Sequence, residues 1–152
     1  MIININLLYA QDQNDTFSFN NKEFRVGQIC YIPMFVYTDY QFSKDDIVKH
    51  LRPLAIFIKQ NAFLKLEIDV NYDEPATNEY VLNLSYHIMQ LIRNYLNDSG
   101  INTDKIKFNY FGNTKPLVSH NLINKYIDKE IKNILYFVNC RIEVKIIDIE
   151  KN

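Results

Sequence analysis

The sequence predicts an α+β domain, a two-layer sandwich in which helices cover one face of a β-sheet. Two observations lead to this fold class. Segments in which apolar and polar residues alternate take turns along the chain with segments whose apolar residues recur every three to four positions. The alternating segments are apolar on one side and charged on the other, which is typical of a sheet with one covered face and one solvated face.

Length and composition favour a single domain. The 152 residues are 47% hydrophobic, and a chain of this length buries about two-thirds of its unfolded surface when it folds. The 17 basic and 18 acidic residues leave a net charge of −1, which argues against a protein that neutralises many phosphates, so no nucleic-acid partner is expected. No apolar run approaches the roughly 20 residues that cross a bilayer, so no transmembrane segment is expected.

The first residues are expected to precede the fold. Residues 1–11 form a short apolar stretch that looks like the last part of a signal peptide without its basic region, although a plain N-terminal strand explains it as well. Polar residues without a periodic pattern follow. We therefore predict a leader or partial signal-like segment at 1–23 and the folded domain at 24–152.

The first elements of the domain are a strand, a helix and a strand. A strand is predicted at 28–37, and Pro33 places it at an edge of the sheet because proline has no N–H to donate to a neighbour. Apolar residues at helical spacing predict a helix at 43–58, which Pro53 should kink or restart. Strict alternation predicts the next strand at 64–70.

The same alternation of elements continues to the end of the chain. A helix is predicted at 81–96, where Ile88 belongs to the apolar stripe and should be buried. A strand at 105–111, a helix at 122–135 and a strand at 141–146 follow. If the strands at 64–70 and 141–146 are neighbours, opposite charges on their solvated face should pair. The charged residues concerned are Lys65, Glu67, Asp69, Arg141, Glu143 and Lys145.

Several short motifs stand in the same order and spacing as in a known family. They are Val70-Asn71-Tyr72-Asp73 in the place of Gly-His-Thr-Asp, Leu84-Ser85, Gly100-Ile101, Gly112, Pro116, and Asn139-Cys140-Arg141-Ile142-Glu143. With these motifs, the chain from about residue 24 to 149 resembles the OmpA-like C-terminal domain of bacterial cell envelopes. The resemblance implies a four-stranded mixed sheet of order 1-4-2-3 with the fourth strand antiparallel to the others.

The resemblance also implies a function. Domains of this family are non-enzymatic and bind peptidoglycan non-covalently through the diaminopimelate of its stem peptide, in the periplasm or at the outer membrane, without a cofactor. The ligand-binding positions that the resemblance transfers to this chain are Asp73, Asn71, Tyr72, Asn139 and Arg141. A zwitterionic ligand needs both an anionic and a cationic partner, and Asp73 should offer its carboxylate, open to solvent, as the anionic one.

The cationic partner is missing, because Ile88 stands where the family has an arginine, fifteen residues after Asp73. His87 is a possible substitute, although it points about 100° away around the helix. Two hypotheses follow. Either a degenerate site still binds peptidoglycan, or the fold has lost that ligand and serves as a protein–protein interaction or structural domain of an envelope assembly.

Other constellations favour no enzyme and no metal site. His50, His87 and His120 lie on separate predicted elements, and Asp73 with Glu74 reads as a solvated turn rather than an acid–base pair. Cys30 and Cys140 lie in apolar strands, where buried inert thiols are the common case. In the sheet order that the resemblance implies, these cysteines start antiparallel neighbours at opposite ends, so we expect two free thiols.

Overall fold

A computed structural model describes residues 16–34 and 44–150. Its elements follow the expected alternation of strands and helices. They are β1 (Ile29–Pro33), α2 (Lys44–Gln60), β2 (Leu64–Asn71), α3 (Asn78–Asp98), η1 (Thr103–Lys105), β3 (Ile106–Gly112), α4 (His120–Ile123), α5 (Lys129–Asn139) and β4 (Arg141–Ile149). The predicted strand residues 35–37 lie outside the described residues, as does the side chain of His50. No helix in the described part of the chain is both long and apolar enough to cross a bilayer.

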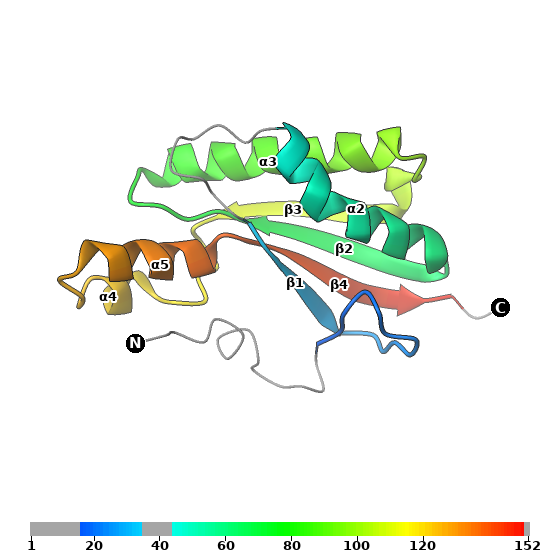
Figure 1. Cartoon of the computed structure of the whole chain (residues 1–152), viewed down its shortest axis with the longest axis horizontal. Coiled ribbons are helices and arrows are strands. Elements are labelled where there is room, and N and C mark those ends of the chain that lie inside the picture. The colour runs from blue at the N-terminus through cyan, green and yellow to red at the C-terminus, as the bar shows by residue number, and fades with distance from the viewer. Residues whose placement is uncertain (1–15, 35–43, 151–152) are drawn as a thin grey trace.

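The four strands form one mixed sheet in the order β1-β4-β2-β3. Strand β4 is antiparallel to β1 and β2, whereas β2 and β3 are parallel. Helices α2 and α3 lie together on one face of this sheet (Figure 1). The predicted α+β class, the strand order and the edge position of the Pro33-bearing strand are therefore confirmed. Helix α2 runs through Pro53 as one helix, so the predicted restart is wrong.

The core lies between the sheet and these two helices. Leu66, Ile68 and Val70 of β2 are at most 1% exposed, because alternate side chains of this central strand face the helices. Ile88 of α3 is 5% exposed, which confirms its predicted burial. Leu91, expected in the same stripe, is 47% exposed. The buried stripe of α3 instead includes Ser85 and Met89 and so lies to one side of the predicted one.

Two motif residues join α3 to the ends of β2 and β3. The Ser85 hydroxyl donates to the Val70 carbonyl oxygen (2.9 Å) and accepts from the Gly112 N–H (3.1 Å). Gly112 has φ +53°, and a Cβ at this position would come within 3.0 Å of the Leu82 backbone. Helix α3 therefore packs directly against the backbone of β3. This contact lies at the C-terminal end of β2, which leads into the segment from Asn71 to Asp73.

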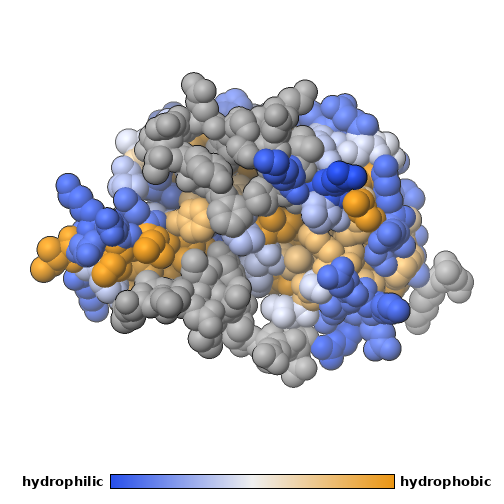
Figure 2. Space-filling view, viewed as in Figure 1, coloured by the Kyte–Doolittle hydropathy of each residue, from blue (hydrophilic) through white to orange (hydrophobic). Residues whose placement is uncertain are grey.

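The third predicted helix is wrong as a single element. It divides into α4 and α5, because the Asp128 side chain accepts hydrogen bonds from the N–H groups of Glu130 and Ile131 and so starts a new helix. These helices project from the left end of the sheet and carry a small core of their own (Figure 1). Ile127, which the predicted helix at 122–135 includes, lies between them in the chain and is 97% exposed. Figure 2 shows hydrophobic surface along this projection.

The described chain is packed before residue 24. Phe17 is 6% exposed, its N–H donates to the Ile29 carbonyl oxygen (3.2 Å), and its ring lies 5.4 Å from that of Phe57. The packed part of the chain therefore includes Phe17, although the sequence placed it in the leader. Residues 1–15 lie outside the described residues, and a leader there stays a prediction.

The second face of the sheet is charged, and its charges pair as expected. Glu67 lies opposite Lys145 in the β2–β4 register, and Lys145 Nζ is 3.3 Å from Glu67 Oε1 and 3.8 Å from Asp69 Oδ2. The predicted pairing between neighbouring strands is therefore confirmed. The face is less open than expected, because Asp69 and Arg141 are 2% and 3% exposed.

Candidate functional site

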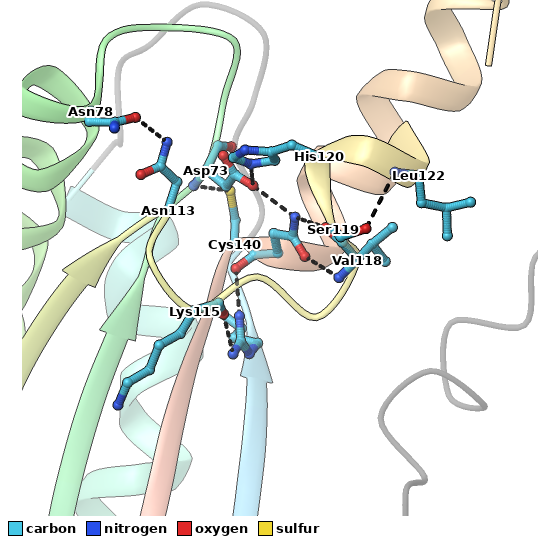
Figure 3. A network of polar contacts seen from close by, with 11 residues as sticks. Asp73, Asn78, Asn113, Lys115, Val118, Ser119, His120, Leu122 and Cys140 are labelled. Carbon is cyan, nitrogen blue, oxygen red and sulfur yellow. Dashed lines mark hydrogen bonds and ion pairs between the residues drawn. The ribbon is translucent and has the colours of Figure 1, made fainter. Parts of the chain in front are cut away.

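A buried polar cluster lies where the family motif predicts a ligand site, at the C-terminal end of β2. Asn71 is the last residue of β2 and lies opposite Arg141, the first residue of β4. Asp73 follows two residues later, His120 begins α4, and Asn139 ends α5. Residues of α4 and α5, 47 and 66 positions away in the sequence, thus converge on the carboxylate of Asp73 (Figure 3).

Asp73 is buried rather than open to solvent, so that expectation is wrong. The residue is 3% exposed. Its Oδ2 accepts a hydrogen bond from Asn139 Nδ2 (2.7 Å) and lies 2.8 Å from His120 Nε2. The His120 side chain is 38% exposed and forms an ion pair with Asp73 when its ring is protonated. A buried carboxylate is stable when it is hydrogen-bonded and paired in this way.

Cys140 holds the main chain of Asp73. Its Sγ accepts from the Asp73 N–H (3.3 Å) and donates to the Asp73 carbonyl oxygen (3.1 Å). Burial raises the pKa of the Cys140 thiol to about 12, so the group stays a neutral donor at physiological pH. Cys140 therefore fixes the main chain from which the Asp73 carboxylate projects. Cys30 and Cys140 are both free and buried, which confirms that prediction.

Asn139 and Arg141 act mainly as supports. The Asn139 amide accepts from Val118 N–H (2.8 Å) and donates to the Val118 carbonyl oxygen (2.9 Å). The Arg141 guanidinium donates to the carbonyl oxygens of Asn139 and Lys115 (3.0 Å each) and to Glu143. Because Arg141 is 3% exposed and its donors already have acceptors within the chain, its cation is not available to a ligand.

Three polar atoms of the cluster have no hydrogen-bond partner among residues 16–34 and 44–150. They are Nδ2 and Oδ1 of Asn71 and Oδ1 of Asp73, all buried. A buried polar group without a partner costs about 1–3 kcal/mol, so unpaired groups close together need a physical explanation. A polar ligand or water would satisfy the Nδ2 donor and the Oδ1 acceptor of Asn71 and the Oδ1 acceptor of Asp73.

The remaining predicted ligand residues lie elsewhere. Tyr72 points into the core, where it is 1% exposed, and burial, with Glu74 nearby, raises the pKa of its hydroxyl. His87 is exposed on α3 with its ring 5.6 Å from that of Tyr86, and no described hydrogen bond or ion pair joins it to Asp73. Of the predicted positions, Asp73, Asn71, Asn139 and Arg141 are brought together; Tyr72 and His87 are not.

His120 is the site residue that the sequence did not reveal. It lies 47 positions from Asp73, and no spacing rule connects the two residues. A local signal existed, because Ser119 caps α4 by accepting from the Leu122 N–H and so places His120 at the start of a helix. The described residues contain no group of three His, Cys, Asp or Glu side chains that could hold a metal ion.

Comparisons with known proteins agree with the fold. No family model matches the chain. A peptidoglycan-associated lipoprotein of Buchnera aphidicola subsp. Baizongia pistaciae is 24% identical over 144 residues, which span 88% of this chain and 81% of the relative. The crystal structure of the peptidoglycan-associated lipoprotein from Burkholderia pseudomallei is 21% identical, with a TM-score of 0.54 over 76% of this chain and 87% of that one.

Two further solved structures share the fold at lower identity. A putative MotB-like protein from Desulfovibrio vulgaris is 15% identical, with a TM-score of 0.58 over 82% of this chain and 74% of that one. The OmpA-like domain of FopA1 from Francisella tularensis is 17% identical, with a TM-score of 0.50 over 81% of this chain and 75% of that one. With the strand order described above, these likenesses show that the chain has the fold of OmpA-like domains.

Proposed function

We propose that this chain is a non-enzymatic binding module of the cell envelope that associates non-covalently with peptidoglycan through the diaminopimelate of the stem peptide. A periplasmic or outer-membrane-associated location fits this function. The observation that carries the proposal is the Asp73 carboxylate, whose Oδ2 is held by Asn139 and His120 and whose Oδ1 has no partner among the described residues. The name of the Buchnera relative supports the same ligand.

The site matches one half of a zwitterion directly. A ligand ammonium group would donate to Asp73 Oδ1, and charge-assisted hydrogen bonds of this kind are stronger than neutral ones. The ammonium group would remove the cost of leaving this buried acceptor unpaired. This gain is available to a ligand with a cationic group and is absent for a purely anionic one.

His120 is our candidate for the missing cation. A doubly protonated ring donates through Nε2 to Asp73 and has a second N–H to offer to a ligand carboxylate. Ile88, the residue at the family's arginine position, is buried in the core and has neither a charge nor a hydrogen-bond donor for a ligand. A single imidazolium N–H replaces a guanidinium that binds carboxylates bidentately, so we expect weaker binding than a site with arginine would give.

A second function remains a candidate because of one observation. Asp73 Oδ2 already has two partners within the chain, and the residue is 3% exposed, so the carboxylate has the surroundings of a structural group. In that case the domain keeps the fold, no longer binds peptidoglycan and binds an envelope protein instead.

Sedimentation with purified sacculi that contain diaminopimelate tests the proposal. Asp73→Asn keeps the size of the side chain and removes its charge, and we expect it to weaken binding by about tenfold or more, the range of one charge-assisted hydrogen bond. Asp104→Asn is the control, because Asp104 is an exposed carboxylate within η1, at the other end of the sheet. A soluble stem peptide should compete with the sacculi. The proposal is refuted if wild type and Asp73→Asn sediment equally with the sacculi, or if neither protein sediments with them.

A further inference from the structure

An open groove lies at the end of the sheet opposite Asp73. It has a volume of about 620 Å³ and lies between the C-terminal end of α2 and the connection from α3 through η1. The first residues of β2 and β3 form its floor, at the right-hand end of the molecule in Figure 1. The peptidoglycan site at the other end of the sheet makes no use of this groove.

The floor of the groove is apolar. Leu64, Leu66 and Ile106 come from the two strands, each at most 9% exposed, while Ile58 of α2 and Ile101 after α3 line the walls. Ligand pockets of about 300–1,000 Å³ are mostly lined by apolar side chains, with a small number of polar groups that fix the orientation of the ligand. The groove has the size and the floor of such a pocket.

The rim of the groove is basic. Lys65 is satisfied within the chain, since its Nζ lies 2.9 Å from Asp148 and 3.9 Å from Glu150. Lys59 on the α2 wall and Lys105 at the end of η1 are exposed, and no carboxylate among residues 16–34 and 44–150 forms an ion pair with either. The apolar floor therefore lies between two positive charges on separate walls.

We propose that this groove binds an extended segment of a partner protein in which one or two apolar side chains are flanked by acidic residues. The apolar side chains fill the floor, and the two carboxylates meet Lys59 and Lys105 on opposite walls. A fatty acid has one carboxylate and would leave one of these lysines without a partner. The segment's backbone also finds partners, because β3 is an edge strand whose outer side has no neighbour among the described strands.

The inference goes beyond peptidoglycan binding and does not depend on it. The groove and the Asp73 cluster lie at opposite ends of β2, so both can be occupied at the same time. A chain that holds the cell wall at one end and a protein at the other would connect the two.

Titration of the isotope-labelled chain with the synthetic peptide Gly-Asp-Leu-Phe-Glu-Gly tests the proposal. We expect amide chemical-shift changes confined to the groove, at Gly100, Ile101 and their neighbours. The double variant Lys59→Glu and Lys105→Glu should bind about tenfold more weakly, with a loss of salt dependence. Its matched control, Lys125→Glu with Lys129→Glu, changes the charge equally at the far end of the molecule and should bind as wild type.

Three results would overturn the proposal. One is equal binding of the charge-reversed peptide Gly-Lys-Leu-Phe-Lys-Gly. Another is tighter binding of sodium laurate than of the acidic peptide, which would assign the groove to a lipid. The third is unchanged binding by Ala62→Trp, since Ala62 is exposed and a large side chain there fills the groove without disturbing the core. Under the proposal, the Lys59→Glu and Lys105→Glu double variant sediments with sacculi as wild type does. A failure of the groove is therefore distinguishable from a failure of the peptidoglycan site.

Discussion

Two buried polar groups at the same end of the sheet differ in how completely they are satisfied. The Ser85 hydroxyl donates to Val70 and accepts from Gly112, so its donor and one acceptor site are used within the fold. Asp73 and Asn71 leave three buried polar atoms without partners in the described part of the chain. Both groups occupy positions of the OmpA-like motifs. The difference teaches that two motif positions can be satisfied to different degrees by the fold itself, and under the proposed function the unsatisfied one binds the ligand.

The largest effect is expected from returning an arginine to the family's position. Ile88 is 5% exposed within an apolar core, so Ile88→Arg buries a charge without a partner and should lower the free energy of unfolding by about 3 kcal/mol or more in urea titrations. Leu91→Arg, on an exposed position of the same helix, should change stability little. A stable Ile88→Arg variant with stronger sacculus binding would show instead that arginine reaches Asp73. Position 88 would then be a ligand-binding position rather than part of the core.

Gly112 tests the structural half of the comparison. Gly112→Ala places a methyl group 3.0 Å from the Leu82 backbone in a left-handed conformation, and should cost about 2–4 kcal/mol because the helix has to move away from β3. The matched control is Gly100→Ala, which has φ +80° but open space around its Cβ and should cost about 1 kcal/mol. Equal losses in urea titrations would show that backbone conformation alone explains the requirement for glycine.

Ser85→Ala should separate stability from binding. The variant leaves the buried Gly112 N–H and the Val70 carbonyl oxygen each short of a partner, which costs about 1–3 kcal/mol. Per folded molecule, sedimentation with sacculi should not change, because no ligand contact is lost. Asp73→Asn should show the opposite pattern, with a large loss of binding and a smaller change in stability. A loss of binding by Ser85→Ala at temperatures where it is fully folded would contradict this division.

Local patterns explain most of what the sequence predicted. Alternation along β2 depends only on neighbouring residues, and so does the helical spacing that places Ile88 in the core. The same spacing extended the third helix through Ile127, because periodicity alone did not reveal that the Asp128 side chain would start a second helix. The site was harder to predict. The contact between Asp73 and His120 joins residues 47 positions apart, and the burial of Asp73 depends on where α4 and α5 pack.

Replacement of the ring tests the role of His120. A protonated ring pairs with Asp73 and has a second N–H to offer to a ligand carboxylate. The groups described next to the ring are Asp73, Asn139 and Tyr136, whose ring lies 5.8 Å away. We therefore expect His120→Gln to bind sacculi a few-fold more weakly than wild type, consistent with the loss of one charged hydrogen bond.

His87→Gln should bind as wild type does, because His87 has no described contact with Asp73. The two variants make the same exchange of side chain, so a general effect of replacing a histidine is common to both. Unchanged binding by His120→Gln would assign the cationic half of the site to another group. It would leave the role of Asp73 unaffected.

The smallest effect is expected on the charged face of the sheet, where the polar groups are satisfied as they are around Ser85. The hydrogen bond from Lys107, together with Lys145, holds the pKa of Glu67 below its ordinary value of 4.5. Because the folded-state pKa is the lower one, Glu67 contributes stability above pH 4.5, and this contribution is lost as the pH falls through the folded-state value. Glu67→Gln should therefore lower the free energy of unfolding by about 0.2–1 kcal/mol at pH 7, the range of a cross-strand pair, and by less at pH 3. Urea titrations at the two pH values measure the difference, with Glu79→Gln, on the exposed first turn of α3, as a control. A loss that is equal at pH 3 and pH 7 would mean that the shape of the side chain, rather than its charge, matters at this position.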